Sequence, residues 1–164
     1  MEETRKKSVF GGFVKLIVVL GAVYAGIVAA GKLVAKKMQQ LEKKNAGNKE
    51  KKYLSVMNGQ VIKISKEPVE EISIQAYLGG VTLDLTEALL EKETEVTIRG
   101  LMSGVVVKVP PMVRVVLDGT NILSGFANMV PNYEAEDLPT VYVYAESVMS
   151  GIAAQMEPDV EKDA

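Results

Sequence analysis

The chain has 164 residues, of which 48% are hydrophobic, and a formal net charge of −2. It contains no cysteine and no histidine, which excludes a disulfide framework, a thiolate metal site and a Ser–His catalytic pair. We therefore expect no enzyme, no metal site, no cofactor and no small-molecule substrate.

An apolar segment lies near the N-terminus. Between Val9 and Gly31, Lys15 is the only charged residue. About twenty apolar residues span the core of a bilayer, and a lysine close to one end extends its charge to the interface. We expect an N-terminal tail over residues 1–9 and a transmembrane helix over residues 10–33.

A cleaved signal peptide ending at Ala30 is the alternative. Lysines follow this position at once, beginning with Lys32, and they favour a retained span that stops translocation. Ala22, Gly26 and Ala30 recur every four residues on one helix face, a spacing that lets two membrane helices approach closely. These three residues are the predicted helix–helix face for a homo-oligomer.

The next segment is strongly basic. Residues 32–52 hold eight lysines and two glutamates, so we expect a basic juxtamembrane helix and linker over residues 34–52, attracted to anionic membrane lipid. By the positive-inside rule, the part of the chain that follows lies on the cytoplasmic side. Nucleic-acid binding is not expected, because aromatic residues are not interleaved with the lysines.

Five nine-residue segments in the rest of the chain resemble one another. They are VMNGQVIKI (56–64), YLGGVTLDL (77–85), LMSGVVVKV (101–109), ILSGFANMV (122–130) and VMSGIAAQM (148–156). Each has Leu or Met at its second place, then a small residue, then glycine. Self-similarity with a period in the twenties is typical of stacked structural repeats.

Apolar residues alternate with polar ones on both sides of each glycine, which predicts strand–turn–strand units. The fold expected is mainly β: a short single-stranded β-helix (β-solenoid) of four to five coils over residues 53–156, followed by an acidic tail over 157–164. An antiparallel sandwich is the alternative. A corner glycine permits positive φ or close backbone approach, and the serines before the glycines should matter less. The predicted corner glycines are Gly59, Gly80, Gly104, Gly125 and Gly151.

Three segments are expected to interrupt the coils. Residues 118–121 and residues 131–140 have the composition of inserted loops, and a short helical turn is expected over residues 86–91. The acidic residues that gather in these segments match no calcium-binding spacing, so we interpret them as solvated. Tyr142 and Tyr144 alternate with core valines and are the candidate partner-binding residues, because tyrosines are enriched at interface hot spots.

The segments YLGGVTLDL and LMSGVVVKVPPMVRVVLDGT resemble the C-terminal domain of LiaF-like proteins, bacterial regulators of the response to cell-wall-active antibiotics. That domain belongs to the toast-rack (adhesin-like) style of single-stranded β-helix. The resemblance covers residues 70–156 and implies a non-catalytic domain at the bacterial cell membrane. It also implies binding to a membrane protein and modulation of envelope-stress signalling. The alternative is a membrane-tethered scaffold that self-assembles through its solenoid. A hydrolase that uses the acidic loops is the least favoured.

Overall fold

The computed structural model describes residue 26, residues 29–135 and residues 137–157. The chain divides into two compact units, Met1–Gln39 and Gln40–Ala164. A helix covers residues 29–45. No helix among the described residues is long and apolar enough to cross a membrane, and most of the predicted span over 10–33 lies outside those residues.

The predicted helix–helix face is described only in part. Gly26 and Ala30 are helical and exposed. Ala22 lies outside the described residues. Self-association through this face therefore stays a prediction.

The second unit consists mainly of strands that form one sheet. Every strand pairing in its described part is parallel, which confirms a solenoid-like β fold and excludes the antiparallel sandwich. The strands are β1 (Glu50–Val56), β2 (Gly59–Tyr77), β3 (Gly80–Leu101), β4 (Gly104–Val109), β5 (Arg114–Ile122), β6 (Gly125–Asn128), β7 (Thr140–Val148) and β8 (Gly151–Met156).

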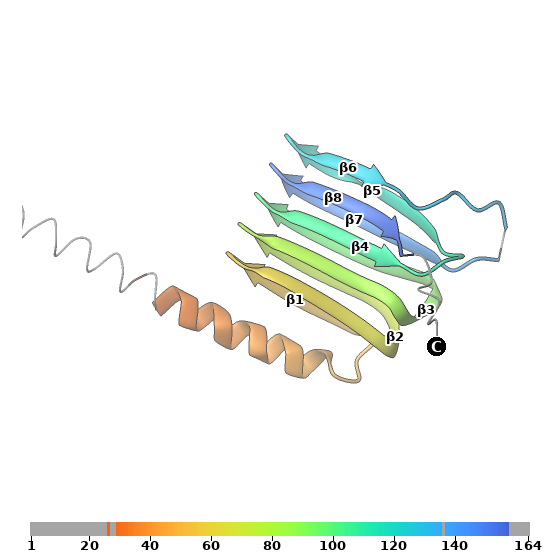
Figure 1. Cartoon of the computed structure of the whole chain (residues 1–164). Coiled ribbons are helices and arrows are strands. Elements are labelled where there is room, and N and C mark those ends of the chain that lie inside the picture. Colours follow the sequence, from red (N-terminus) through yellow and green to blue (C-terminus); the bar gives the residue numbers. More distant parts are fainter. Residues whose placement is uncertain (1–25, 27–28, 136, 158–164) are drawn as a thin grey trace, which may run out of the picture. The chain divides into compact units, whose positions relative to one another are not determined.

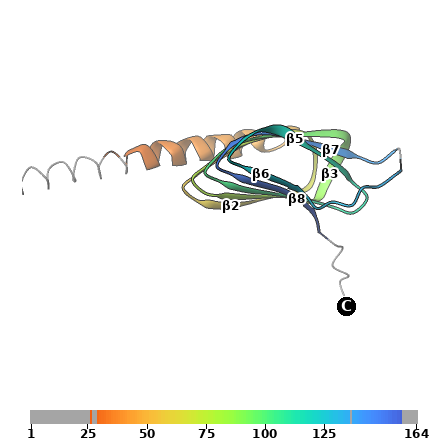
Figure 2. The same ribbon diagram turned by 90° about the horizontal axis from the view of Figure 1, so that it is seen from above.

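Each coil is a flattened loop of two strands that meet at a repeat corner (Figure 2). β2 and β3 are long because each one bends and continues from one coil into the next. In chain order, coil 1 is β1 with the first part of β2, and coil 2 is the rest of β2 with the first part of β3. Coil 3 is the rest of β3 with β4, coil 4 is β5 with β6, and coil 5 is β7 with β8.

The coils do not stack in chain order. β7 pairs with both β3 and β5, and β8 pairs with both β4 and β6. Coil 5 therefore lies between coil 3 and coil 4, and coil 4 forms one end of the stack (Figure 1). The segment over residues 129–139 returns the chain to this inserted position. Its described residues belong to no helix or strand, as predicted for the loop over 131–140.

The flattened coils stack into two layers. One holds β1, β5, β7 and the later parts of β2 and β3, and the other holds β4, β6, β8 and the first parts of β2 and β3. Rows of apolar side chains between these layers form the core. Ile74, Ile98 and Ala145 are aligned on one layer, and Leu83, Val107 and Ala154 are aligned on the other. All six are buried. The period-two alternation of the sequence places these residues inward on successive coils.

Two of the predicted interruptions are wrong. Residues 86–91 belong to β3, where Glu87 and Leu89 pair with Ser65 and Pro68 of the coil below. The helix-forming composition of this segment is overridden by strand pairing with the neighbouring coil. Residues 118–121 belong to β5 and stay in register with β7.

Candidate interaction surfaces

The backbone at the corners differs from the prediction for the glycines. Positive φ occurs at the Leu or Met two places before each glycine: Met57 (52°), Leu78 (54°), Met102 (48°), Leu123 (52°) and Met149 (52°). The five corner glycines instead begin the next strand, with no positive φ. A Cβ at Gly59, Gly104, Gly125 or Gly151 would meet no atom within 4 Å, and at Gly80 only the Gly104 carbonyl oxygen at 3.8 Å. The prediction that a Cβ at these glycines would clash with the adjacent coil is therefore wrong.

The serines before the corner glycines are structural, contrary to expectation. Ser103 and Ser150 are buried. The Ser103 N–H donates to Ser150 Oγ at 3.2 Å, and the Ser150 N–H donates to Ser124 Oγ at 2.9 Å. These bonds join the corners of coils 3, 5 and 4. At this place a small side chain with an acceptor oxygen accepts hydrogen bonds from backbone N–H groups. A larger side chain would not leave room for these bonds.

Two apolar residues from every coil form what we call the corner ridge. One row is Val56, Tyr77, Leu101, Val148 and Ile122, in register across the coils. The second row is Met57, Leu78, Met102, Met149 and Leu123, one residue later in each coil. The side chains are exposed or half-buried, with Met57 73% and Leu123 84% exposed.

The second row combines two unfavourable properties. Left-handed backbone costs an L-residue roughly 1–2 kcal/mol and is normally assigned to Gly or Asn. Large exposed apolar side chains add solvent-exposed hydrocarbon, and contiguous patches of it typically mark interaction sites. Stability alone therefore does not explain Leu or Met at this place in all five coils. The ridge has the composition of a binding surface.

Replacing Met102 with asparagine tests this interpretation. Asparagine tolerates left-handed backbone better than methionine, so we expect Met102→Asn to leave the free energy of unfolding unchanged or raise it by up to about 1 kcal/mol. The control is Val61→Asn at an exposed strand position, where asparagine is disfavoured and stability should fall. Thermal unfolding of both variants is the measurement. A clear loss of stability in Met102→Asn would show that the side chain has a packing role.

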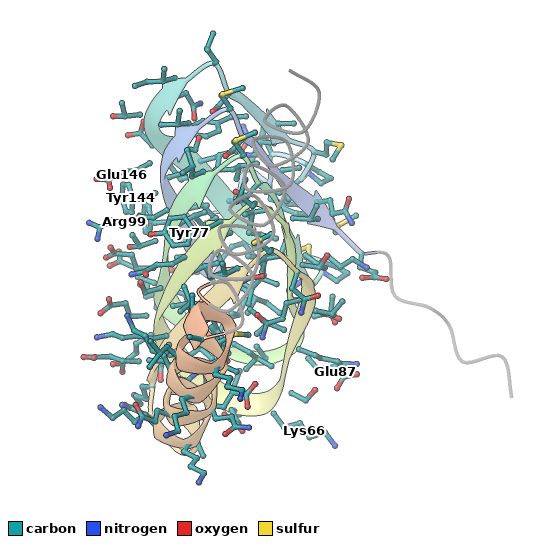
Figure 3. All side chains as sticks on the ribbon, turned by 90° about the vertical axis from the view of Figure 1, so that its left-hand side faces the viewer. Lys66, Tyr77, Glu87, Arg99, Tyr144 and Glu146 are labelled. Carbon is teal, nitrogen blue, oxygen red and sulfur yellow. The ribbon has the colours of Figure 1, made fainter. Side chains whose placement is uncertain are left out.

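Tyr142 and Tyr144 lie on the outer face of β7, as predicted. Their rings are stacked, with centroids 6.4 Å apart and planes within 8°. Beside them, the Arg99 Nε donates to Glu146 Oε2 at 3.0 Å, which links β3 to β7 (Figure 3). The tyrosines are separate from the corner ridge, and their role in partner binding stays a prediction.

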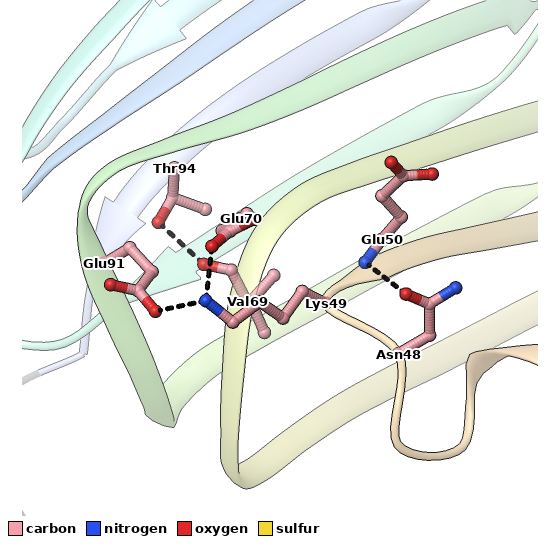
Figure 4. Close-up of polar contacts among 7 residues, drawn as sticks. All are labelled: Asn48, Lys49, Glu50, Val69, Glu70, Glu91 and Thr94. Carbon is pink, nitrogen blue, oxygen red and sulfur yellow. Dashed lines mark hydrogen bonds and ion pairs between the residues drawn. The ribbon is translucent and has the colours of Figure 1, made fainter.

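The acidic residues collect where β2 and β3 bend. Lys49 forms ion pairs with Glu70 and with Glu91, the latter at 3.1 Å (Figure 4). The hydrogen bonds that Lys49 donates to Glu70 and Glu91 raise its pKa above the ordinary value. Where residues are described, no group of three or more acids, histidines or cysteines is placed to hold a metal ion.

Two carboxyl groups on β3 have lowered pKa values, whereas a general acid needs a raised pKa. Burial tends to raise the pKa of Asp84, but hydrogen bonds from Thr86 together with the charges of Lys63 and Lys108 outweigh it and hold that pKa below the ordinary value. The hydrogen bond from Lys63 lowers the pKa of Glu87. Both groups are therefore ionised at neutral pH, whereas a catalytic acid has a raised pKa.

Comparison with protein-family models, curated proteins and solved structures finds no match to this chain.

Proposed function

We propose that the protein is a non-catalytic binding module, held at the cell membrane by its N-terminal segment, whose corner ridge binds a protein partner. The observation that supports it is the ridge itself: exposed Leu or Met at a left-handed position in every coil. The partner surface would be apolar, because neither row of the ridge contains a charged residue. In line with the LiaF-like resemblance, the partner is a membrane protein of an envelope-stress pathway.

The composition of the ridge favours a protein over a lipid surface. Surfaces that bind anionic membranes combine apolar side chains with lysine or arginine, and neither row of the ridge contains a basic residue. Methionine is flexible and adapts to varied protein surfaces, and it occupies the second row at Met57, Met102 and Met149. The basic residues lie earlier in the chain, within 32–52.

A site-specific crosslinker in the full chain, in native membranes, tests the proposal. A photoreactive residue at Met102 should give one discrete protein adduct, whereas the same group at Leu89, which is also exposed but lies at the bend of β3, should not. The adduct should be lost on introducing Met149→Gln and kept on introducing Leu89→Gln. Adducts with lipid alone would assign the ridge to the membrane surface. Equal adducts from both positions would remove the ridge as a specific site.

The alternative function is a scaffold that self-assembles through the solenoid. One specific observation favours this second candidate: the end of the stack at coil 4 has a sheet edge that no described strand pairs with.

A further inference from the structure

The two ends of the coil stack differ in how their edges are closed. At coil 1, the Asn45 carboxamide takes the place of a neighbouring strand: its Oδ1 accepts from the Lys52 N–H at 2.8 Å and its Nδ2 donates to the Lys52 carbonyl at 2.9 Å. Lys51 is buried at the same end, where its Nζ donates to the Asn45 carbonyl at 3.1 Å and pairs with Glu67. Charged and amide groups thus cap this end.

Coil 4 at the other end is only partly capped: Asp118 Oδ1 accepts from the Gly119 N–H at 2.7 Å and Asn128 Nδ2 donates to the Val115 carbonyl at 3.0 Å. β5 and β6 pair with β7 and β8 on one side, and no described strand pairs with their other side. Core side chains remain partly exposed there, namely Leu117, Phe126 and Val130. Terminal repeats of a soluble solenoid normally have a polar outer face, and natural edge strands carry lysine or proline against pairing. No charged residue lies between Asp118 and Glu134.

Hydrogen bonds show which backbone groups of β5 face the open edge. The Arg114 N–H donates to the Pro139 carbonyl, and the Ile122 carbonyl accepts from Met149, both at 2.9 Å and both on the β7 side. Because successive residues of a strand alternate in direction, the odd-numbered residues point to the open edge. Asn128 Nδ2 donates to one of these groups, the Val115 carbonyl, at 3.0 Å, and that oxygen can still accept a second bond.

We propose that this edge pairs with the same edge of a second copy of the chain, antiparallel about a two-fold axis at Val116. β5 carries two charges, Arg114 and Asp118, on the same outer face as Val116. Antiparallel pairing centred on Val116 places each Arg114 opposite the Asp118 of the other copy. In the same register, Val115 of one copy and Leu117 of the other form a hydrogen-bonded pair. This agrees with the direction of their backbone groups, which point to the open edge. A register centred on Asp118 would instead oppose two carboxylates, which is unfavourable.

The capped end decides between a closed dimer and a filament. A head-to-tail stack needs the edge of β1, which Asn45 and Lys51 occupy. An isologous contact uses only the open edge, so assembly stops at two copies. This inference rests on the edge of coil 4 and is independent of the corner ridge.

Disulfide trapping in the detergent-solubilised full chain tests the contact directly, because the chain has no native cysteine. At a non-hydrogen-bonded antiparallel pair the Cα atoms lie about 4.5 Å apart, which is within reach of a disulfide. Val116→Cys should therefore form a covalent dimer on mild oxidation, and Val61→Cys, exposed on β2, should not. Equal trapping at both positions, or at neither, would overturn the proposal.

Sedimentation of charge variants provides the second test. Val116→Lys should weaken the dimer at least tenfold while Val61→Lys leaves it intact. Asp118→Arg and Arg114→Asp should each weaken the homodimer, and mixing the two variants should restore a mixed dimer with opposite charges facing each other. A dimer that survives Val116→Lys unchanged would assign association to another surface, such as the N-terminal helix face, and would overturn the proposal without bearing on the ridge.

Discussion

Replacing Gly79 with alanine is expected to destabilise the fold by about 2–3 kcal/mol, the upper part of the range for a strained backbone position. A Cβ at Gly79 would lie 2.2 Å from the Asn58 carbonyl oxygen and 3.0 Å from the Asn58 nitrogen. Both atoms belong to the backbone of the adjacent corner, so relief requires coils 1 and 2 to move apart. For a domain of this size the melting temperature should fall by roughly 10–20 °C.

The matched control is the next residue, Gly80. A Cβ there would have the Gly104 carbonyl oxygen at 3.8 Å as its nearest neighbour, an ordinary contact. Gly80→Ala should therefore change stability by less than about 0.5 kcal/mol, as for a surface substitution. Chemical unfolding of the two variants measures the difference. Equal stabilities would mean that the corner backbone is free to adjust and that close packing between coils does not depend on Gly79.

The corner conformation was not predictable from the glycines. The motif places glycine in every repeat, and glycine is the residue most often found at positive φ. The structure assigns positive φ to Leu and Met instead, as at Met102, against local propensity. Local backbone propensity therefore did not identify these positions.

The strands and their inward faces were predictable, because alternation of apolar residues reports burial directly. The order of the coils was not predicted, since similar repeats can pair with any neighbour. One residue, Asn128, shows why coil 4 is terminal. Asn128 occupies the inward row that holds Leu83, Val107 and Ala154 in other coils, and burying an amide in mid-stack is costly. At the end of the stack it instead reaches the Val115 carbonyl.

Contacts specific to coil 5 support its inserted position. Gly119 of coil 4, at φ 145°, lies against Ala145 of coil 5, where a Cβ would be 1.9 Å from the Ala145 carbonyl oxygen. Arg99 of coil 3 pairs with Glu146, whereas stacking in chain order would place Thr120 beside it. An exposed ion pair contributes at most about 1 kcal/mol, so the Arg99–Glu146 pair does not determine the order by itself.

The core should show the largest effect of a single truncation. Leu83 on β3 is 0% exposed and belongs to the central cluster, with neighbouring coils on both sides. Leu83→Ala should lower the free energy of unfolding by about 2–5 kcal/mol, through lost burial and the cavity that remains. Strand pairing above and below restricts collapse of the site, which favours the upper half of that range.

Leu89 on the same strand is the control for residue type. It is 57% exposed, at the bend, so Leu89→Ala should cost less than about 1 kcal/mol. Denaturant titrations of both variants should give equal slopes and different midpoints, because the surface exposed on unfolding is similar. A Leu83→Ala variant as stable as Leu89→Ala would contradict a closely packed interior between the two layers. A lowered slope for Leu83→Ala alone would instead indicate that the coils unfold separately, as expected of a repeat stack whose neighbours are only weakly coupled.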